Sequence, residues 1–354
     1  MVLYNVNEFV PMFGFNLIGM QTDALKRIRD GCGVSVDLEL VYWHTVEKKI
    51  GEYDWATLDK QVKRNTDAGL RLMIMCCGVP HCLPQKLYAT TASGCAYQEI
   101  LSFWNDDAIA YTQNYLQAVI DRYGGEDVTV IWHGFLGGEQ YLWNAPVYYD
   151  TAARADWKAK YGDDIPKRGG GAHLDPQMKE WLTQGIIKHQ VAVHDVLIKQ
   201  HNETWDATQY LIGLQSDSNG NFARFDVLSA YRDRWPDATR MVMQYTYLGN
   251  TVHGNSEVVD RLVTELDCKL VVEANYCGGL LGPPTNPVPS PHIILDGGFN
   301  KIKPENWCGQ VISPLHPFRG YKVMEPWMMT ALKWAVDEWR LVRDEGMEKS
   351  CPLA

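Results

Sequence analysis

The stretch Val128–Gln140 reads VTVIWHGFLGGEQ. It begins as a run of apolar and β-branched residues, which is typical of a buried strand, and then passes through glycines to a single carboxylate, Glu139. A carboxylate placed directly after a buried strand loses hydration, and folding alone gives little reason to put one there. We therefore interpret Glu139 as one half of a catalytic pair of acids.

The second acid of the pair is predicted in Lys269–Tyr276, which reads KLVVEANY and carries Glu273 inside an apolar strand. The rest of the chain is then a scaffold that brings these two acids together. For each acid taken alone, the alternative is a structural ion pair with an arginine or lysine.

Apolar strand patterns alternate with helical periodicity along the whole chain, which is typical of parallel sheets with helical crossovers. The predicted strands are Met12–Gly19, Val34–Trp43, Leu70–Gly78, Val128–Leu136, Gln209–Gln215, Arg240–Leu248, Lys269–Tyr276 and Gln310–Leu315. The predicted helices are Thr22–Asp30, Asp54–Gly69, Asp106–Tyr123, Pro176–Gln200, Phe225–Trp235, Ser256–Leu266 and Glu325–Arg343.

Eight strands in a chain of 354 residues predict an α/β protein built as one (β/α)8 TIM barrel, a single catalytic domain over residues 1–354. Residues 141–176, rich in glycine and aromatic residues, form a long loop insertion after the fourth strand. This insertion either covers the mouth of the barrel or forms a contact between copies, so a homo-oligomer is left open. An open doubly wound sheet is the alternative, but it predicts a glycine-rich phosphate loop after the first strand, and GxGxxG is absent.

The second predicted strand alternates between an apolar face and a face that carries Asp37 and Glu39. We expect the apolar face to meet the surrounding helices and the polar face to point into the barrel. Asp37 and Glu39 lie early on this strand, away from its carboxyl end, and are therefore predicted to be structural acids.

Active residues of such barrels lie at the carboxyl ends of the strands. These ends, together with the insertion after the fourth strand, carry aromatic and hydrogen-bonding side chains around the two acids. The predicted substrate-binding residues are Asn16, Trp43, His44, His81, Tyr141, Trp143, Tyr245, Tyr247, Asn275 and His316.

Two facing carboxylates suit the cleavage of a glycosidic bond, because one acid protonates the leaving oxygen while the other attacks the anomeric carbon or activates water. Glu139 fits the acid/base role, since burial raises the pKa of a carboxyl group. Glu273 fits the role of the ionised nucleophile, held by neighbouring donors such as Tyr245.

Other chemistries lack their motifs. The sequence contains no GxSxG and no HExxH. Cys76, Cys77, Cys82 and Cys95 lie near His81, but their spacing matches no standard zinc pattern. We therefore expect no metal and no cofactor. A non-catalytic carbohydrate-binding barrel, or a barrel enzyme such as a lyase or aldolase, remains the alternative.

The net charge and the cysteine content limit the expected partners and the expected cellular compartment. The formal net charge is −10 and no basic stripe is present, so nucleic acid is not expected as a partner. No apolar run approaches the ~20 residues of a membrane span, and the first residues lack a signal-peptide pattern. Nine scattered cysteines, an odd number, are typical of reduced thiols and predict a cytoplasmic protein. The expected partner is an oligosaccharide or glycoside substrate.

The stretch Trp43–Asp59, WHTVEKKIGEYDWATLD, resembles the W-x-x-x-E-x-x-x-G-x-Y-D-[FW]-x-x-L-D signature that follows the second strand in clan A glycoside hydrolases. The resemblance is strongest to the catalytic domain of the bacterial β-galactosidases of family forty-two. It implies a barrel with the acid/base after strand four and the nucleophile at the end of strand seven, which are Glu139 and Glu273 here. It also implies a retaining mechanism through a covalent glycosyl-enzyme.

The sequence departs from that clan at one position of the site. The clan usually has Asn-Glu after strand four, and that asparagine contacts the sugar 2-hydroxyl, whereas Gly138 precedes Glu139 here. The run GFLGGEQ is also similar to the G-x-x-G-E pattern of β-amylases, which invert at an α-linkage. An inverting, β-amylase-like enzyme is therefore the second prediction within the glycosidases.

Overall fold

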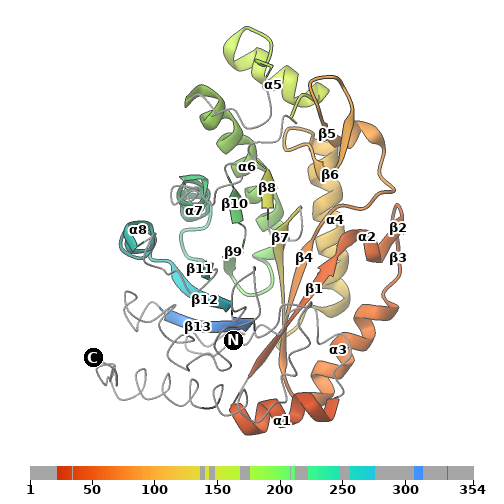
Figure 1. The fold of residues 1–354 in the computed structure, drawn as a ribbon, viewed down its shortest axis with the longest axis vertical. Coiled ribbons are helices and arrows are strands. Elements are labelled where there is room, and N and C mark those ends of the chain that lie inside the picture. Colours follow the sequence, from red (N-terminus) through yellow and green to blue (C-terminus); the bar gives the residue numbers. More distant parts are fainter. Residues whose placement is uncertain are drawn as a thin grey trace, which may run out of the picture.

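The computed structural model describes residues 22–33, 35–135, 140–142, 148–167, 176–207, 209–211, 222–246, 256–275, 307–313 and 333. Two parallel sheets organise these residues (Figure 1). The first has the order β1-β4-β7, with β1 at Val36–Tyr42, β4 at Arg71–Cys77 and β7 at Val128–Gly134. The second has the order β13-β12-β11-β9.

The strands of the second sheet are β9 (Glu203–Asp206), β11 (Thr239–Thr246), β12 (Lys269–Asn275) and β13 (Trp307–Ser313). All of their pairings are parallel. A further parallel pair, β8 (Gln140–Leu142) with β10 (Gln209–Leu211), follows β7 and β9 in the chain.

Helices connect successive strands and pack on the outside of the sheets (Figure 1). They are α1 (Thr22–Cys32), α3 (Ala56–Ala68), α4 (Asp106–Tyr123), α6 (Pro176–Leu197), α7 (Phe222–Arg234) and α8 (Ser256–Leu266). Their ends follow local chemistry: Asn105 caps α4 by accepting from the amides of Asp107 and Ala108, and Gly69 closes α3 at φ +72°.

Short helices and strands lie beyond the carboxyl ends of the first sheet. They are α2 (Trp43–Val46), β2 (Glu47–Lys49), β3 (Glu52–Tyr53), the 3-10 turn η2 (Gln85–Leu87), β5 (Tyr88–Thr90) and β6 (Ala96–Leu101). The antiparallel hairpins β2–β3 and β5–β6 therefore lie in the loops that follow β1 and β4. The sequence patterns did not predict either hairpin.

The buried apolar residues form two clusters, one between the sheets and one between sheets and helices. The inner cluster includes Val36, Leu38, Met73, Ile131 and Val271, so it draws on strands of both sheets. A layer of bulky side chains contributed by several strands is the filling expected inside a closed barrel.

The faces of β1 are the reverse of those predicted. Val36 and Leu38 lie in the inner cluster, whereas Asp37 and Glu39 face α3, where Arg64 forms ion pairs with both carboxylates. The physical reason is that bulky apolar side chains fill the interior, while a buried acid is tolerated where a partner cation meets it. The structural role predicted for both acids is thus retained, in a different place.

Two further predictions, the fifth strand and the long loop after the fourth strand, also need correction. The strand of the second sheet that follows α6 is β9 (Glu203–Asp206), and Gln209–Leu211 forms the separate strand β10, which pairs with β8. In the sequence, the charged residue Asp206 makes β9 resemble a polar segment. In the structure, the side chain of Asp206 is buried and forms an ion pair with Arg224 of α7 at 2.7 Å. The predicted loop 141–176 contains the helix α5 (Thr151–Tyr161), which Asp150 caps by accepting from the amide of Ala153.

Six of the eight predicted strands overlap strands of the two sheets, and the predicted fifth strand, Gln209–Gln215, overlaps the short strand β10. The predicted first strand, Met12–Gly19, lies outside the described residues, as does the predicted closing helix Glu325–Arg343 except for Lys333. Closure into eight strands therefore stays a prediction. Within the described part of the chain, no helix combines the length and apolarity that crossing a membrane requires.

Candidate functional site

A hollow of about 160 Å³ opens beyond the carboxyl ends of β1, β4 and β7, and we call it the strand-end hollow. Gly78 and Val79 belong to its lining, and its functional side chains are those of Tyr42, His44, His81, Gln98, Glu99 and Phe135. Carboxyl strand ends carry the active residues in barrels, so this position is where a site is expected.

His44 and His81, two of the predicted substrate-binding residues, both line the strand-end hollow. The two ring centroids lie 5.4 Å apart, and the ring of Tyr42 lies 5.4 Å from that of His44. Burial, followed by the neighbouring His81 and Lys48, lowers the pKa of His44, so its imidazole is neutral at neutral pH. A neutral imidazole offers one donor and one acceptor to a ligand.

Gly78 brings the backbone close to these rings. It has φ +80°, and a Cβ added there would meet the ring of Tyr42 at 3.6 Å and Nδ1 of His44 at 3.7 Å. Its amide donates to the carbonyl of Gly134 at 2.9 Å, which ties the ends of β4 and β7 together. Glycine is required here because the left-handed conformation strains any residue that has a Cβ.

The β5–β6 hairpin supplies Gln98 and Glu99, which strand-end reasoning missed because both belong to β6, within the connection between β4 and α4. Both side chains are exposed, and the hydroxyl of Tyr97 donates to Oε2 of Glu99 at 3.2 Å. The turn residues Ser93-Gly94 between two short β-forming runs were the available signal for a hairpin. Tyr42 was also missed, although it ends β1 on the same face as Leu38.

Trp43 has no exposed surface with which to contact a substrate, which corrects its predicted role. Its ring stacks on Tyr115 with centroids 4.6 Å apart, and its indole N–H donates to Glu47. The other carboxylate oxygen of Glu47 accepts from the amide of Gly51 at 2.6 Å. The W-x-x-x-E-x-x-x-G part of the signature is thus a structural clamp around the β2–β3 turn.

The remaining predicted residues fall into two groups. Tyr141, Tyr245, Glu273 and Asn275 lie in β8, β11 and β12, where the structure places their backbone. Residues outside the described part of the chain are Asn16, Trp143, Glu139, Tyr247 and His316. Glu139 immediately precedes Gln140, the first residue of β8.

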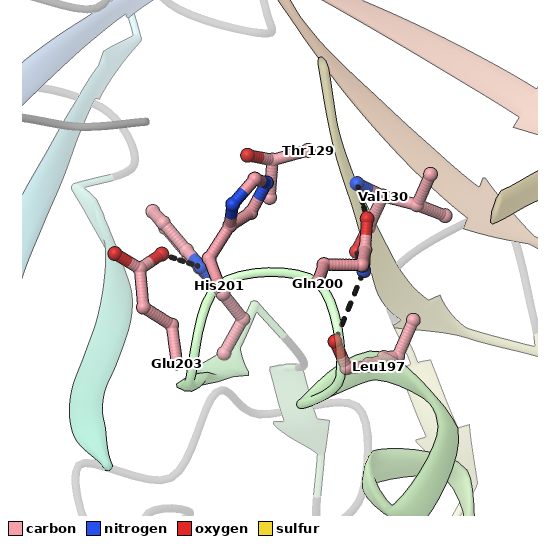
Figure 2. Close-up of a pocket in the computed structure, with 7 residues that line it drawn as sticks. Thr129, Val130, Leu197, Gln200, His201 and Glu203 are labelled. Carbon is pink, nitrogen blue, oxygen red and sulfur yellow. Dashed lines mark hydrogen bonds between the residues drawn. The ribbon is translucent and has the colours of Figure 1, made fainter. Parts of the chain in front are cut away.

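A second, smaller cavity lies at the opposite end of the strands, between β7, β9 and the turn after α6 (Figure 2). It measures about 10 Å³ and is lined by polar groups of Thr129, Gln200, His201 and Glu203. Gln200 bridges α6 to β7, since its amide nitrogen donates to the carbonyl of Val130 at 2.9 Å. The cavity holds about one water-sized sphere, too little for a substrate.

The cysteines do not assemble a metal site in the described part of the chain. Cys76 and Cys77 are buried in β4, and Cys95 is exposed in the β5–β6 hairpin. No group of three or more histidine, cysteine, aspartate or glutamate side chains placed to hold a metal ion occurs among the described residues.

Comparison with known proteins gives a consistent result for the fold. No family model and no curated protein matches the sequence. Among solved structures, the catalytic domain of the β-amylase from Paenibacillus polymyxa superposes with a TM-score of 0.55 at 14% identity, covering 86% of this chain and 91% of that one. The β-galactosidase from the psychrophilic Marinomonas ef1 superposes with a TM-score of 0.61 at 12% identity, covering 96% of this chain and 61% of that one.

A third match is the β-galactosidase from the Antarctic haloarchaeon Halorubrum lacusprofundi, with a TM-score of 0.60 at 12% identity over 94% of this chain and 58% of that one. This chain therefore spans about three fifths of each β-galactosidase, which are 61% and 58% covered. Identities this low show the fold alone. The chain shares the fold of these glycoside hydrolases, which confirms at that level the resemblance drawn from Trp43–Asp59.

Proposed function

We propose that the chain is a glycoside hydrolase that cleaves a β-linked sugar with retention, using Glu139 as acid/base and Glu273 as nucleophile. The observation that carries the proposal is the strand-end hollow, which combines imidazole, amide, carboxylate and aromatic side chains in a fold shared with β-galactosidases. Aromatic faces and convergent polar groups are what a sugar-binding site requires.

The backbone of β12 supports the nucleophile assignment. Glu273 is in register with Tyr245 of β11 and with Val311 of β13, so it occupies a central strand of the second sheet. Position 273 is also two residues after Val271, which contributes to the inner cluster. Successive positions alternate between the faces of a strand, and position 273 therefore falls on the inner face.

The position of Glu139 in the chain supports its role as acid/base. In the sequence it follows β7, a strand of the first sheet, whereas Glu273 belongs to β12 of the second sheet. In the proposed reaction, Glu273 attacks the anomeric carbon while Glu139 gives its proton to the leaving oxygen. Glu139 then removes a proton from the water that hydrolyses the glycosyl-enzyme.

The other predicted residues complete the proposed substrate contacts around this pair. We place Asn16, His44, His81, Tyr141, Trp143, Tyr245, Tyr247, Asn275 and His316 among them and leave out Trp43, which is buried. The reaction proposed for this site balances without a metal or an organic cofactor, because both proton transfers involve Glu139.

Conservative amide variants test the proposal. Glu139→Gln and Glu273→Gln are each expected to lower kcat/KM on aryl β-glycosides by about 10³-fold or more, because each removes a group that acts in the transition state. Glu126→Gln is the matched control: Glu126 is exposed just before β7, at the opposite end of that strand. Circular dichroism spectra that match the wild type establish folding, and full activity of Glu273→Gln ends the assignment.

A further inference from the structure

The side chains of the strand-end hollow differ in charge as well as in chemistry. Among the described residues that line the hollow, Glu99 is the one acid, and none is a lysine or an arginine. Lys48 lies beside His44, where its ammonium donates to the carbonyl of that residue at 2.8 Å. The described side chains that a ligand meets in the hollow therefore include one carboxylate and no lysine or arginine.

The hollow also offers flat apolar surface beside its hydrogen-bonding groups. Tyr42 and Phe135 contribute aromatic rings from the ends of β1 and β7. Gln98, Glu99 and the two imidazoles provide donors and acceptors from three separate segments. A pyranose ring has the matching pair of properties, an apolar C–H face and a rim of hydroxyl groups.

We propose that the strand-end hollow is a subsite for one uncharged sugar ring, and that Glu99 is the residue that excludes sugars bearing a carboxylate or sulfate. This inference rests on the proposed function for the class of ligand, and it adds which sugars are accepted. Glu99 accepts hydrogen bonds from hydroxyl groups, whereas its negative charge repels an anion bound beside it.

Direct binding tests the subsite without requiring turnover. Galactose, glucose and galacturonate are titrated into the wild-type chain by calorimetry at pH 7. At least one hexose is expected to bind, and galacturonate is expected to bind at least about tenfold more weakly. Glu99→Gln should bring the two affinities within about threefold of one another, because it removes the charge and keeps a hydrogen-bonding amide.

Two further variants test whether the discrimination against galacturonate comes from the charge of Glu99 and whether the hexose binds in the hollow. Glu126→Gln removes an exposed carboxylate at the opposite end of β7 and should leave the discrimination unchanged. His44→Ala is expected to weaken hexose binding by about tenfold or more, because it removes a ring from the hollow.

The results distinguish failure of the subsite from failure of the proposed function. The inference is overturned if neither hexose binds, or if Glu99→Gln leaves the discrimination against galacturonate intact. It stands if hexoses bind with the expected dependence on Glu99 even when the chain hydrolyses no glycoside, an outcome that removes only the proposed catalysis.

Discussion

Glu203 is a buried acid at the end of the strands opposite the strand-end hollow (Figure 2). Its side chain is 4% exposed, Oε2 accepts from the indole of Trp205 at 3.2 Å, and Oε1 has no hydrogen-bond partner among the described residues. Burial raises the pKa of Glu203 to about 7. The polar cavity beside it is also lined by Thr129, whose hydroxyl has no partner within the described part of the chain, and it is the place for a bound water.

This raised pKa predicts a pH-dependent stability. An unfolded glutamate ionises near 4.5, whereas folded Glu203 keeps its proton up to about 7. Between these values the unfolded state binds fewer protons, so the free energy of unfolding falls as pH rises, by roughly 3 kcal/mol in all. Glu203→Gln should lose this contribution to the pH dependence between pH 4.5 and 7, as measured by urea unfolding at several pH values.

The control for this prediction is an exposed acid. Glu126→Gln should keep the wild-type pH dependence, because Glu126 lies at the surface in the folded chain. A Glu203→Gln profile that runs parallel to the wild-type profile would show that Glu203 is ionised in the folded protein.

Helix α6 has a glycine in its interior that close packing requires. A Cβ added at Gly185 would lie 2.5 Å from Cζ2 of Trp104, whose ring is stacked on Trp181 with centroids 4.0 Å apart. The glycine thus lets α6 approach the segment that precedes α4. Two stacked indoles cannot easily yield to a new methyl group.

Gly185→Ala should therefore destabilise the protein, although glycine-to-alanine changes in exposed helices usually stabilise by about 0.5–1 kcal/mol. We expect the free energy of unfolding to fall by about 1–3 kcal/mol from overpacking against Trp104. Gln184→Ala, at an exposed neighbour on the same helix, is the control and should be neutral or slightly stabilising. Thermal unfolding of both variants measures the change in stability. A Gly185→Ala variant that is more stable than the wild type would contradict the predicted overpacking against Trp104.

The stereochemistry of the proposed reaction depends on the separation of the Glu139 and Glu273 carboxyl groups. The run GFLGGEQ, which is similar to the G-x-x-G-E pattern of β-amylases, makes inversion the specific alternative to the retention implied by the Trp43–Asp59 signature. The separation of the carboxyl groups decides between them: ~5–5.5 Å for retention and ~6.5–9.5 Å for inversion.

We predict retention, observed as a β-anomer that forms first and then mutarotates. Proton NMR of the product, recorded from the first minutes of hydrolysis of aryl β- and α-glycosides, measures it. Initial release of an α-anomer from a β-glycoside would indicate inversion, with a water between the substrate and a more distant carboxylate. Cleavage of α-glycosides alone would favour the β-amylase-like alternative.

The order of the elements could be predicted from the sequence, because helical and strand periodicities are local properties of the chain. Helices α3, α4 and α8 and strands β1, β4, β7, β11 and β12 lie within a few residues of their predicted positions. The pattern was weakest at β9, whose acid Asp206 depends on Arg224, a residue of the following helix. A local sequence pattern does not show that a buried acid has an ion-pair partner on another element.

Which side chains meet depends on how the elements pack against one another in three dimensions. Asp37 and Glu39 face Arg64 because the bulky apolar face of β1 packs into the inner cluster between the two sheets, a choice that alternation within one strand leaves open. The strand-end hollow likewise joins His44 and His81 to Glu99 of a hairpin that the sequence patterns did not predict. Periodicity shows that a strand has two faces, but the packing of other elements against each face determines which one is buried inside.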